Sequence, residues 1–468
     1  MKKQAGWIAA VGIIAWGSIP SPIAHAQEGD GLSYSFSVDQ RLNANDNRSF
    51  DVVSAGTTVT STTGLGFALR SETRTQRLNF NLGATLEGGY FASDDSSSLE
   101  LTAPNARLQY SRTAARSSFN FGAAVRRNDV STLVLDPDLV DPDADPDADP
   151  DATFDPDDLI LDEGTRQVTS LSTRLTTGIG APIRLSFSAG LTDVGYTDTT
   201  DPELVNNRSV RLGARASFTI NPTIEASTFV NVRQFEEDNL ANREVDRLNV
   251  GVGLQYTLSE TTSVSANVSA NRVETTEMAV TSTSEGAGFG FSVTNERPNG
   301  SIGLSFNRSI SANGANDSVN LSRSFALRDG SFNVSLGLVD GAASTTSTTA
   351  NVSYRRALPT GSISASFRQS LSTDDDEDVL RTRVAVNYSQ DINAVSSFGA
   401  GLSIANSDVL GVGADSTRTS LSLTYNRQLA EDWALQTGYS LQRADEEGAA
   451  SRTSNSIFVG ARKTFSFR

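Results

Sequence analysis

Residues 247–259 read RLNVGVGLQYTLS, and in this stretch large apolar side chains alternate strictly with polar or small ones. Side chains of a β-strand point alternately to its two faces, so Leu248 and Val250 share one face while Arg247 and Asn249 share the other. The second face is too small and too polar for a protein core. A wall with lipid on one side and water on the other suits both faces, so the stretch predicts a strand of a transmembrane β-barrel.

The same alternation recurs along the chain and predicts an all-β fold, an antiparallel transmembrane β-barrel of about 22 strands. An even number agrees with bacterial single-chain barrels. The expected strands lie near residues 31–41, 60–72, 76–91, 105–112, 117–127, 167–177, 183–194, 208–220, 223–235, 244–258, 262–272, 286–295, 300–311, 317–328, 331–340, 348–357, 361–371, 380–390, 395–405, 417–429, 433–443 and 455–467.

Connection lengths support this order of strands. Links after even-numbered strands are short and rich in turn residues, as at Asn221-Pro222 and Arg328-Asp329-Gly330. Links after odd-numbered strands are longer, which is typical of a barrel with both termini in the periplasm. The long links are expected at residues 92–104, 128–165, 195–207, 273–285 and 406–416.

The N-terminus reads as a secretory signal over residues 1–26. Lys2 and Lys3 precede an apolar run that is too short to span a bilayer, and the small residues Ala24 and Ala26 mark a cleavage site. We therefore expect residues 27–468 to form a single exported barrel domain.

Composition narrows the possible functions. The chain has no Cys, and its one His is His25, inside the expected signal, so catalysis that needs a thiolate or an imidazole cannot be built. Removal of Lys2 and Lys3 leaves 36 basic against 55 acidic residues, a net charge of −19, which disfavours nucleic-acid binding. We expect no enzyme and no cofactor.

The C-terminal residues alternate toward aromatic side chains at Phe465 and Phe467. This resembles the final strand that outer-membrane barrels present to the barrel-assembly machinery, although Lys463 lies on the apolar side and Arg468 follows. The whole mature chain resembles Gram-negative outer-membrane β-barrels of the porin-like or exopolysaccharide-associated kind. The resemblance implies a multi-pass location in the bacterial outer membrane, with membrane lipid, lipopolysaccharide and the assembly machinery as partners.

A siderophore-type receptor also has 22 strands, and by resemblance it would carry a globular plug domain before the first strand. Here only residues 27–30 separate the expected signal from the first expected strand. We therefore expect a barrel with no plug domain.

Arginine dominates the charged residues on the inward positions. An ionised Arg facing lipid at the middle of the bilayer costs roughly 2–4 kcal/mol, so these side chains should face the lumen. A water-filled lumen tolerates charged side chains, which explains why the arginines face it but not why most of the inward charges are positive. A cationic wall would favour anions. The predicted pore wall comprises Arg107, Arg126, Arg174, Arg211, Arg215, Arg233, Arg247, Arg355, Arg368 and Arg383.

The longest connection, residues 128–165, is the expected third outer loop, and it holds an Asp-Pro-Asp-Ala repeat. By resemblance to porins it would fold into the lumen and narrow the pore, whereas its composition alone is typical of a disordered, solvated segment. Loose binding of divalent cations is a further reading, but the turn Gly and closing Glu of a calcium loop are missing, so no dedicated metal site is expected. The weak candidate ligands are Asp141, Asp143, Asp145, Asp147, Asp149 and Asp151.

These features together predict a channel for passive diffusion of small hydrophilic or anionic solutes. One alternative is a barrel for export or biogenesis of a surface polysaccharide, in which the lumen would guide an anionic glycan. Inward aromatic residues that could stack on sugars are few, namely Phe229 and Phe458. A second alternative is a structural or adhesive surface barrel.

Overall fold

The computed structural model describes residues 31–54, 56–91, 96–129, 164–199, 204–238, 242–311, 314–341, 346–374, 377–409 and 415–467. The expected signal peptide and nearly all of the expected third outer loop lie outside the described residues. Over the described ranges, no helix is long and apolar enough to cross a membrane.

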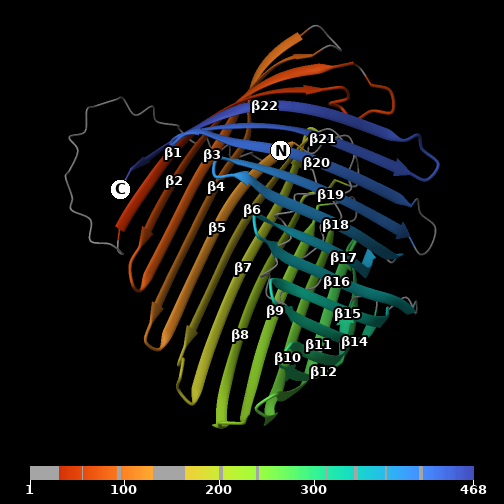
Figure 1. Cartoon of the computed structure of the whole chain (residues 1–468). Helices are drawn as coiled ribbons and strands as arrows, with labels where there is room; N and C mark the ends of the chain where they lie inside the picture. Colours follow the sequence, from red (N-terminus) through yellow and green to blue (C-terminus); the bar gives the residue numbers. More distant parts are fainter. Residues whose placement is uncertain are drawn as a thin grey trace, which may run out of the picture.

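The chain folds into 22 antiparallel strands that form one closed sheet (Figure 1). Each strand pairs with its neighbours in the sequence, and β22 pairs with β1 to close the barrel. The strands are β1 (Gly31–Asn45), β2 (Thr58–Glu72), β3 (Gln76–Phe91), β4 (Ser96–Ala114), β5 (Ser117–Asp129), β6 (Thr165–Thr177), β7 (Ile183–Thr197), β8 (Asn207–Asn221), β9 (Ile224–Glu237), β10 (Arg243–Ser259), β11 (Thr262–Glu277), β12 (Val280–Arg297), β13 (Gly300–Ser311), β14 (Gly314–Leu327), β15 (Gly330–Asp340), β16 (Thr346–Leu358), β17 (Gly361–Asp374), β18 (Glu377–Asn393), β19 (Ser396–Val409), β20 (Ser416–Ala430), β21 (Trp433–Glu446) and β22 (Arg452–Phe467).

The fold has its apolar side chains on the outside. Leu248, Val250 and Val252 are 41%, 45% and 61% exposed, and the register places other large apolar residues of neighbouring strands beside them. Few apolar side chains are buried in the described part of the chain. A bacterial outer-membrane barrel has this arrangement, because lipid takes the place of a core around the sheet.

The 22 expected strands are all present, and the turns named at Asn221-Pro222 and Arg328-Asp329 are confirmed. At the turn between β12 and β13, Gly300 has a φ of +127°, and a Cβ there would lie 2.1 Å from the carbonyl oxygen of Ser324. Only glycine fits this position.

Two of the outer loops are shorter in the structure than the sequence predicts. The segment 273–285 is not a loop, because β11 and β12 continue through it and are joined by Met278 and Ala279 alone, both with positive φ. Likewise β4 begins at Ser96, inside the expected loop 92–104. The strand ends here carry Ser and Thr on both faces, so backbone pairing continues after the apolar alternation has stopped.

Side chains reinforce the seam where the first and last strands meet. The rings of Tyr34 and Phe467 stack with centroids 5.0 Å apart, and those of Phe36 and Phe465 lie 6.3 Å apart. The seam thus uses both aromatic residues of the predicted assembly signal, whose recognition by the assembly machinery stays a prediction.

We predict that Phe465→Ala combined with Phe467→Ala lowers the free energy of unfolding, because each aromatic pair contributes about 0.5–1.5 kcal/mol beyond the burial of its area. Urea titration of the refolded barrel, followed by its shift in gel mobility, measures this. Phe306→Ala is the matched control, since Phe306 stacks on Phe289 at 5.3 Å far from the seam. The seam variant should also reduce the amount of assembled barrel in cells more than the control does, and equal reductions would contradict a special role of the seam.

Candidate functional site

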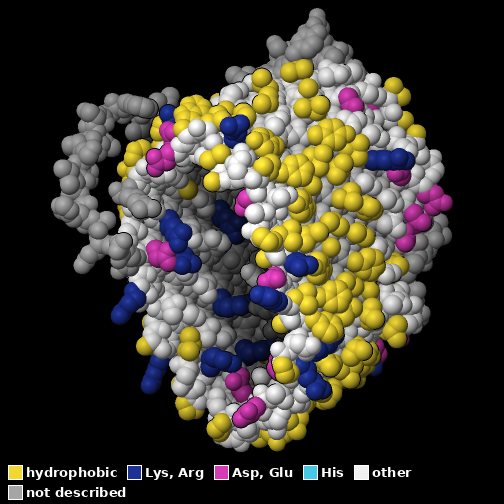
Figure 2. Space-filling model, viewed as in Figure 1, with side chains coloured by type: hydrophobic (Ala, Val, Ile, Leu, Met, Phe, Trp, Pro, Cys, Tyr) yellow, Lys and Arg dark blue, Asp and Glu magenta, His cyan; other side chains and the backbone are white. Residues whose placement is uncertain are grey.

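The inner face of the barrel is the candidate site. It carries the polar half of each alternating strand, mainly Ser, Asn, Thr, Gly and Arg. Figure 2 shows dark blue basic side chains gathered in the hollow of the barrel, while hydrophobic side chains cover the outer surface beside it. Charge in this protein therefore lies where water can reach it.

All ten arginines of the predicted pore wall lie on this lumen face, since the register pairs them with inward residues of the neighbouring strands. They are Arg107 on β4, Arg126 on β5, Arg174 on β6, Arg211 and Arg215 on β8, Arg233 on β9, Arg247 on β10, Arg355 on β16, Arg368 on β17 and Arg383 on β18. The register brings five of them into direct cross-strand pairs with one another and leaves the other five beside uncharged residues. Whether they select anions stays a prediction.

The first arginine row crosses three strands. Arg233 on β9 lies directly opposite Arg211 on β8 and directly opposite Arg247 on β10. On the same face, the Arg215 guanidinium lies 5.5 Å from the centre of the Phe229 ring. Like charges placed directly opposite each other destabilise a sheet, so this row concentrates positive charge at a cost.

The second arginine row runs from β17 to β22. Arg368 lies opposite Arg383, and the register then continues through Ala405, Arg418, Ala444 and Arg452. Ala405 and Ala444 are only 1% and 5% exposed. The alternation of short and long side chains lets the arginines lie along the wall between them.

The two rows face each other across the lumen. β20 follows β9 by 11 strands, which is half of the 22 strands of the barrel. Positive charges on opposite walls add their potentials, so the lumen between them is more positive than either wall would make it alone.

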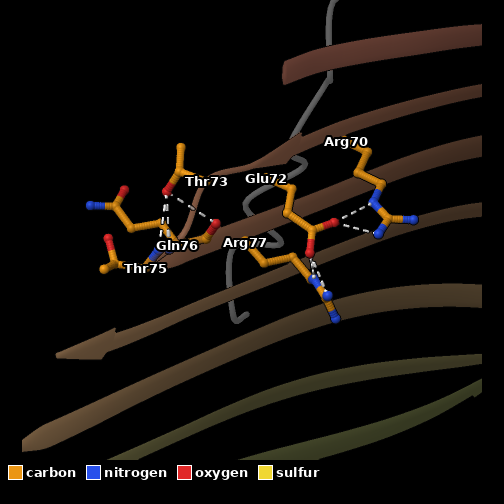
Figure 3. Close-up of polar contacts among 6 residues, drawn as sticks. All are labelled: Arg70, Glu72, Thr73, Thr75, Gln76 and Arg77. Carbon is orange, nitrogen blue, oxygen red and sulfur yellow. Dashed lines mark hydrogen bonds and ion pairs between the residues drawn. The ribbon is translucent and has the colours of Figure 1, made fainter. Parts of the chain in front are cut away.

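Arginines near the short turns are arranged differently, because acids lie beside them. Glu72 forms ion pairs with both Arg70 and Arg77 at the turn between β2 and β3 (Figure 3). Arg184 pairs with Glu225 at 2.8 Å. Positive charge near the turns is thus partly neutralised.

The first outer loop, described for residues 46–54 and 56–57, folds into the lumen. The Asn47 side-chain amide is 4% exposed and donates hydrogen bonds to the carbonyl oxygens of Asp51, at 2.7 Å, and of Thr453 on β22, at 2.9 Å. Phe50 is 5% exposed, and the Arg418 guanidinium of β20 lies 5.9 Å from its ring centre. Loop 1 therefore covers the wall as far as β20 and narrows the outer part of the lumen.

The sequence placed an infolded segment in the third loop instead. Residues 130–163 of that loop, with Asp141 and the rest of the acidic repeat, lie outside the described residues, so its constriction and cation binding are untested. In the described part of the chain, no group of three or more His, Cys, Asp or Glu side chains could hold a metal ion.

On its described inward positions, the lumen wall from β11 to β15 carries charge only at strand ends, at Glu277 on β11 and Glu296 on β12, and is neutral between them. Hydroxyls and amides bond to one another there, as in Ser301 with Ser324 at 2.8 Å and Ser335 with Asn320 at 2.7 Å. The sides of the lumen thus differ in charge and in cover: two carry arginine rows, one of these lies partly under loop 1, and the wall from β11 to β15 is largely neutral.

Two features of the site were missed or left open by the sequence. Arg166 lies just outside the expected strand 167–177, yet it is 6% exposed and its guanidinium lies 5.9 Å from the centre of the Tyr196 ring. Phe50 lies in a loop, where alternation gives no signal. Neither was recognisable without knowing that the wall extends beyond the membrane.

Comparisons with known proteins show the fold. No protein-family model matches the chain, and no curated protein matches its sequence. Among solved structures, the FrpB iron transporter from Neisseria meningitidis matches with a TM-score of 0.57 at 9% identity, over 92% of this chain and 81% of that one. The ferric-catecholate import receptor Fiu from E. coli K12 matches with a TM-score of 0.57 at 9% identity, over 94% and 82%. The copper transporter OprC matches with a TM-score of 0.53 at 10% identity, over 93% and 80%.

The chain is a multi-pass β-barrel of the bacterial outer membrane, similar in fold to these transporters. The prediction of passive diffusion is wrong, because the matching structures are named as transporters and an import receptor. The porin-like type, the polysaccharide alternative and the adhesive alternative gain no support. None of the three is named as an enzyme. The absence of a plug domain stays a prediction.

We predict that Asn47→Ala releases loop 1 from the wall. The change removes both amide hydrogen bonds and leaves buried carbonyl groups without them, which costs about 1–3 kcal/mol. The measurement is limited trypsin digestion, with cleavage after Arg48 expected in the variant and resistance in the parent. Ser49→Ala is the control, because Ser49 bonds only to Asp51 within the loop. Resistance of Asn47→Ala would contradict the anchoring role.

We also predict that the first arginine row attracts anions in the lumen. Asn231 lies between the arginines of β8, β9 and β10, and the chain has no native Cys. An anionic methanethiosulfonate should react with Asn231→Cys at least about tenfold faster than a cationic one, since a charged cleft raises encounter rates by that order. Ser305→Cys on the neutral wall should discriminate little, and Leu212→Cys, which faces lipid, should stay unlabelled. Equal rates for both reagents at Asn231→Cys would refute the attraction.

Proposed function

We propose that this chain forms the barrel of an outer-membrane import receptor for a small anionic metal chelate of the ferric-catecholate class. The observation that carries the proposal is the pair of opposed arginine rows inside a barrel similar in fold to an iron transporter and a ferric-catecholate import receptor.

The chemistry of arginine fits such a ligand. A guanidinium is always charged, donates paired hydrogen bonds to oxyanions and stacks on aromatic faces. A ferric complex of three catecholates carries three negative charges and exposes aromatic rings, so it offers both kinds of contact. By the same argument, a copper complex would need a net negative charge to bind to these arginines.

Placement of the rows fits capture from outside. Arg233 and Arg247 lie in the half of the lumen nearer the outer loops, and Arg418 lies beneath loop 1. Near the turns, acids lie beside Arg70, Arg77 and Arg184, while in the rows Arg452 has Glu446 at 4.0 Å. A ligand would meet the strongest positive field first and a weaker one on its way to the periplasm. Such a gradient needs a gated release step and argues for uptake by a receptor.

The test is equilibrium binding of an iron-55-labelled hexadentate tris-catecholate complex to the refolded protein. A neutral ferric tris-hydroxamate of similar size is the ligand control. We predict that Arg233→Gln with Arg247→Gln, or Arg368→Gln with Arg383→Gln, weakens catecholate binding at least about tenfold, because each lost charge-assisted hydrogen bond contributes about 1.5–3 kcal/mol.

The matched variant is Arg107→Gln with Arg355→Gln, which removes the same charge from the lumen outside the two rows. It should bind the complex like the parent. The proposal fails if the neutral complex binds as tightly as the anionic one, or if the matched variant loses as much affinity as the row variants.

A further inference from the structure

The outer surface of the barrel carries a set of basic residues at the end where the short turns lie. Each lies within four residues of a strand's turn end and shares a face with the lipid-facing apolar residues. We name them the turn-end cations. They are Arg112 on β4, Arg297 on β12, Arg323 on β14, Arg356 on β16, Arg427 on β20 and Lys463 on β22. At the same end and on the same face, no described strand residue is acidic.

Most of the turn-end cations have an aromatic companion two positions away on the same face. The pairs are Tyr110 with Arg112, Arg323 with Phe325, Tyr354 with Arg356, Tyr425 with Arg427, and Lys463 with Phe465. Aromatic residues of this kind form the girdle that marks the level of the lipid head groups in outer-membrane barrels. The cations therefore lie at head-group level.

Two members show where the charged groups point. Arg323 donates a 2.8 Å hydrogen bond to the side-chain oxygen of Asn299, in the turn between β12 and β13, and its guanidinium lies 4.3 Å from the Phe325 ring centre. Lys463 lies 3.5 Å from Asp432, in the turn between β20 and β21. Both side chains extend toward the rim, as long basic side chains do at a membrane interface. The register of β14 with both neighbouring strands runs unbroken through Arg323.

The opposite end of the same outer surface has the opposite sign. Among the described side chains, the acids there are Asp193, Glu236, Glu244, Asp246, Glu274, Glu285, Asp317, Asp340, Asp408 and Asp445. The arginines on this face and at this end are Arg127, Arg208, Arg272, Arg308 and Arg443. The lipid-facing surface is thus basic at the turn end and net acidic at the loop end.

We infer that the turn-end cations bind the phosphate groups of anionic phospholipids in the leaflet that faces the periplasm. Short turns lie on the periplasmic side of outer-membrane barrels, which places these residues in that leaflet. Basic residues near a membrane surface attract anionic lipids, and the aromatic rings beside them anchor the contact at the right depth. The source is lipid phosphate, because five of the six cations are fixed two residues from a ring that must lie in the bilayer.

The inference goes beyond the proposed import function and is tested without any chelate. Spin-labelled phosphatidylglycerol or phosphatidylcholine is added to the refolded full chain in phosphatidylcholine vesicles, and the fraction of motionally restricted lipid gives the relative association constant. We expect a preference for phosphatidylglycerol of at least about threefold, and loss of most of it in the variant Arg112→Gln, Arg297→Gln, Arg356→Gln and Arg427→Gln.

The matched control changes four lipid-facing arginines at the loop end to Gln, at positions 127, 208, 272 and 443, and so removes the same charge. It should keep the parental preference. Equal loss in both variants, or a preference unchanged in the turn-end variant, overturns the inference. So does loss of the preference when inorganic phosphate replaces chloride at constant ionic strength, since the residues would then bind free phosphate. Heat-modified gel mobility checks that each variant has folded.

Discussion

In a bilayer every backbone N–H and C=O group must find a partner within the protein, and the rest of this structure depends on that constraint. Lipid offers no hydrogen bonds, so a sheet can cross it only if no edge is left open. The pairing of β22 with β1 meets the condition, with Tyr34 and Phe36 stacked on Phe467 and Phe465 across the seam. Closure then removes the need for an apolar core and leaves the interior to polar chemistry.

That freedom explains how arginine can serve different ends in one chain. On the lumen face it can lie opposite another arginine, as Arg233 does, because water screens the repulsion. On the lipid face it is tolerated only where the side chain reaches the rim, as at Arg323. What each arginine can contact thus depends on which face of its strand it occupies and on its height in the membrane. Net charge, which is −17 for the whole chain, says nothing of this division.

The alternation of residues was enough to predict the strand number, the order of turns and loops, and the lumen-facing side of Arg211, Arg233 and Arg383. The prediction failed where successive residues do not alternate between apolar and polar side chains. Thr275 and Ser282 belong to strand extensions that are polar on both faces, and Phe50 reaches its partner Arg418 from a loop. Function was the weaker prediction, since the lining of a wall does not reveal whether transport is passive, and only the likeness of the whole barrel to import proteins pointed elsewhere.

The arrangement of acids decides how the arginines act. Near the turns Glu72 and Glu225 accept ion pairs from lumen arginines, whereas Arg355 lies between Ser331 and Ser364 in the register. In the outer half, β9 and β20 carry opposed arginine rows, and loop 1 lies over the second. Because electrostatic potentials add, two opposed rows make the potential between them more positive than either row would alone. Tolerance of charge by water does not account for arginines placed directly opposite one another in the register on two sides of the lumen.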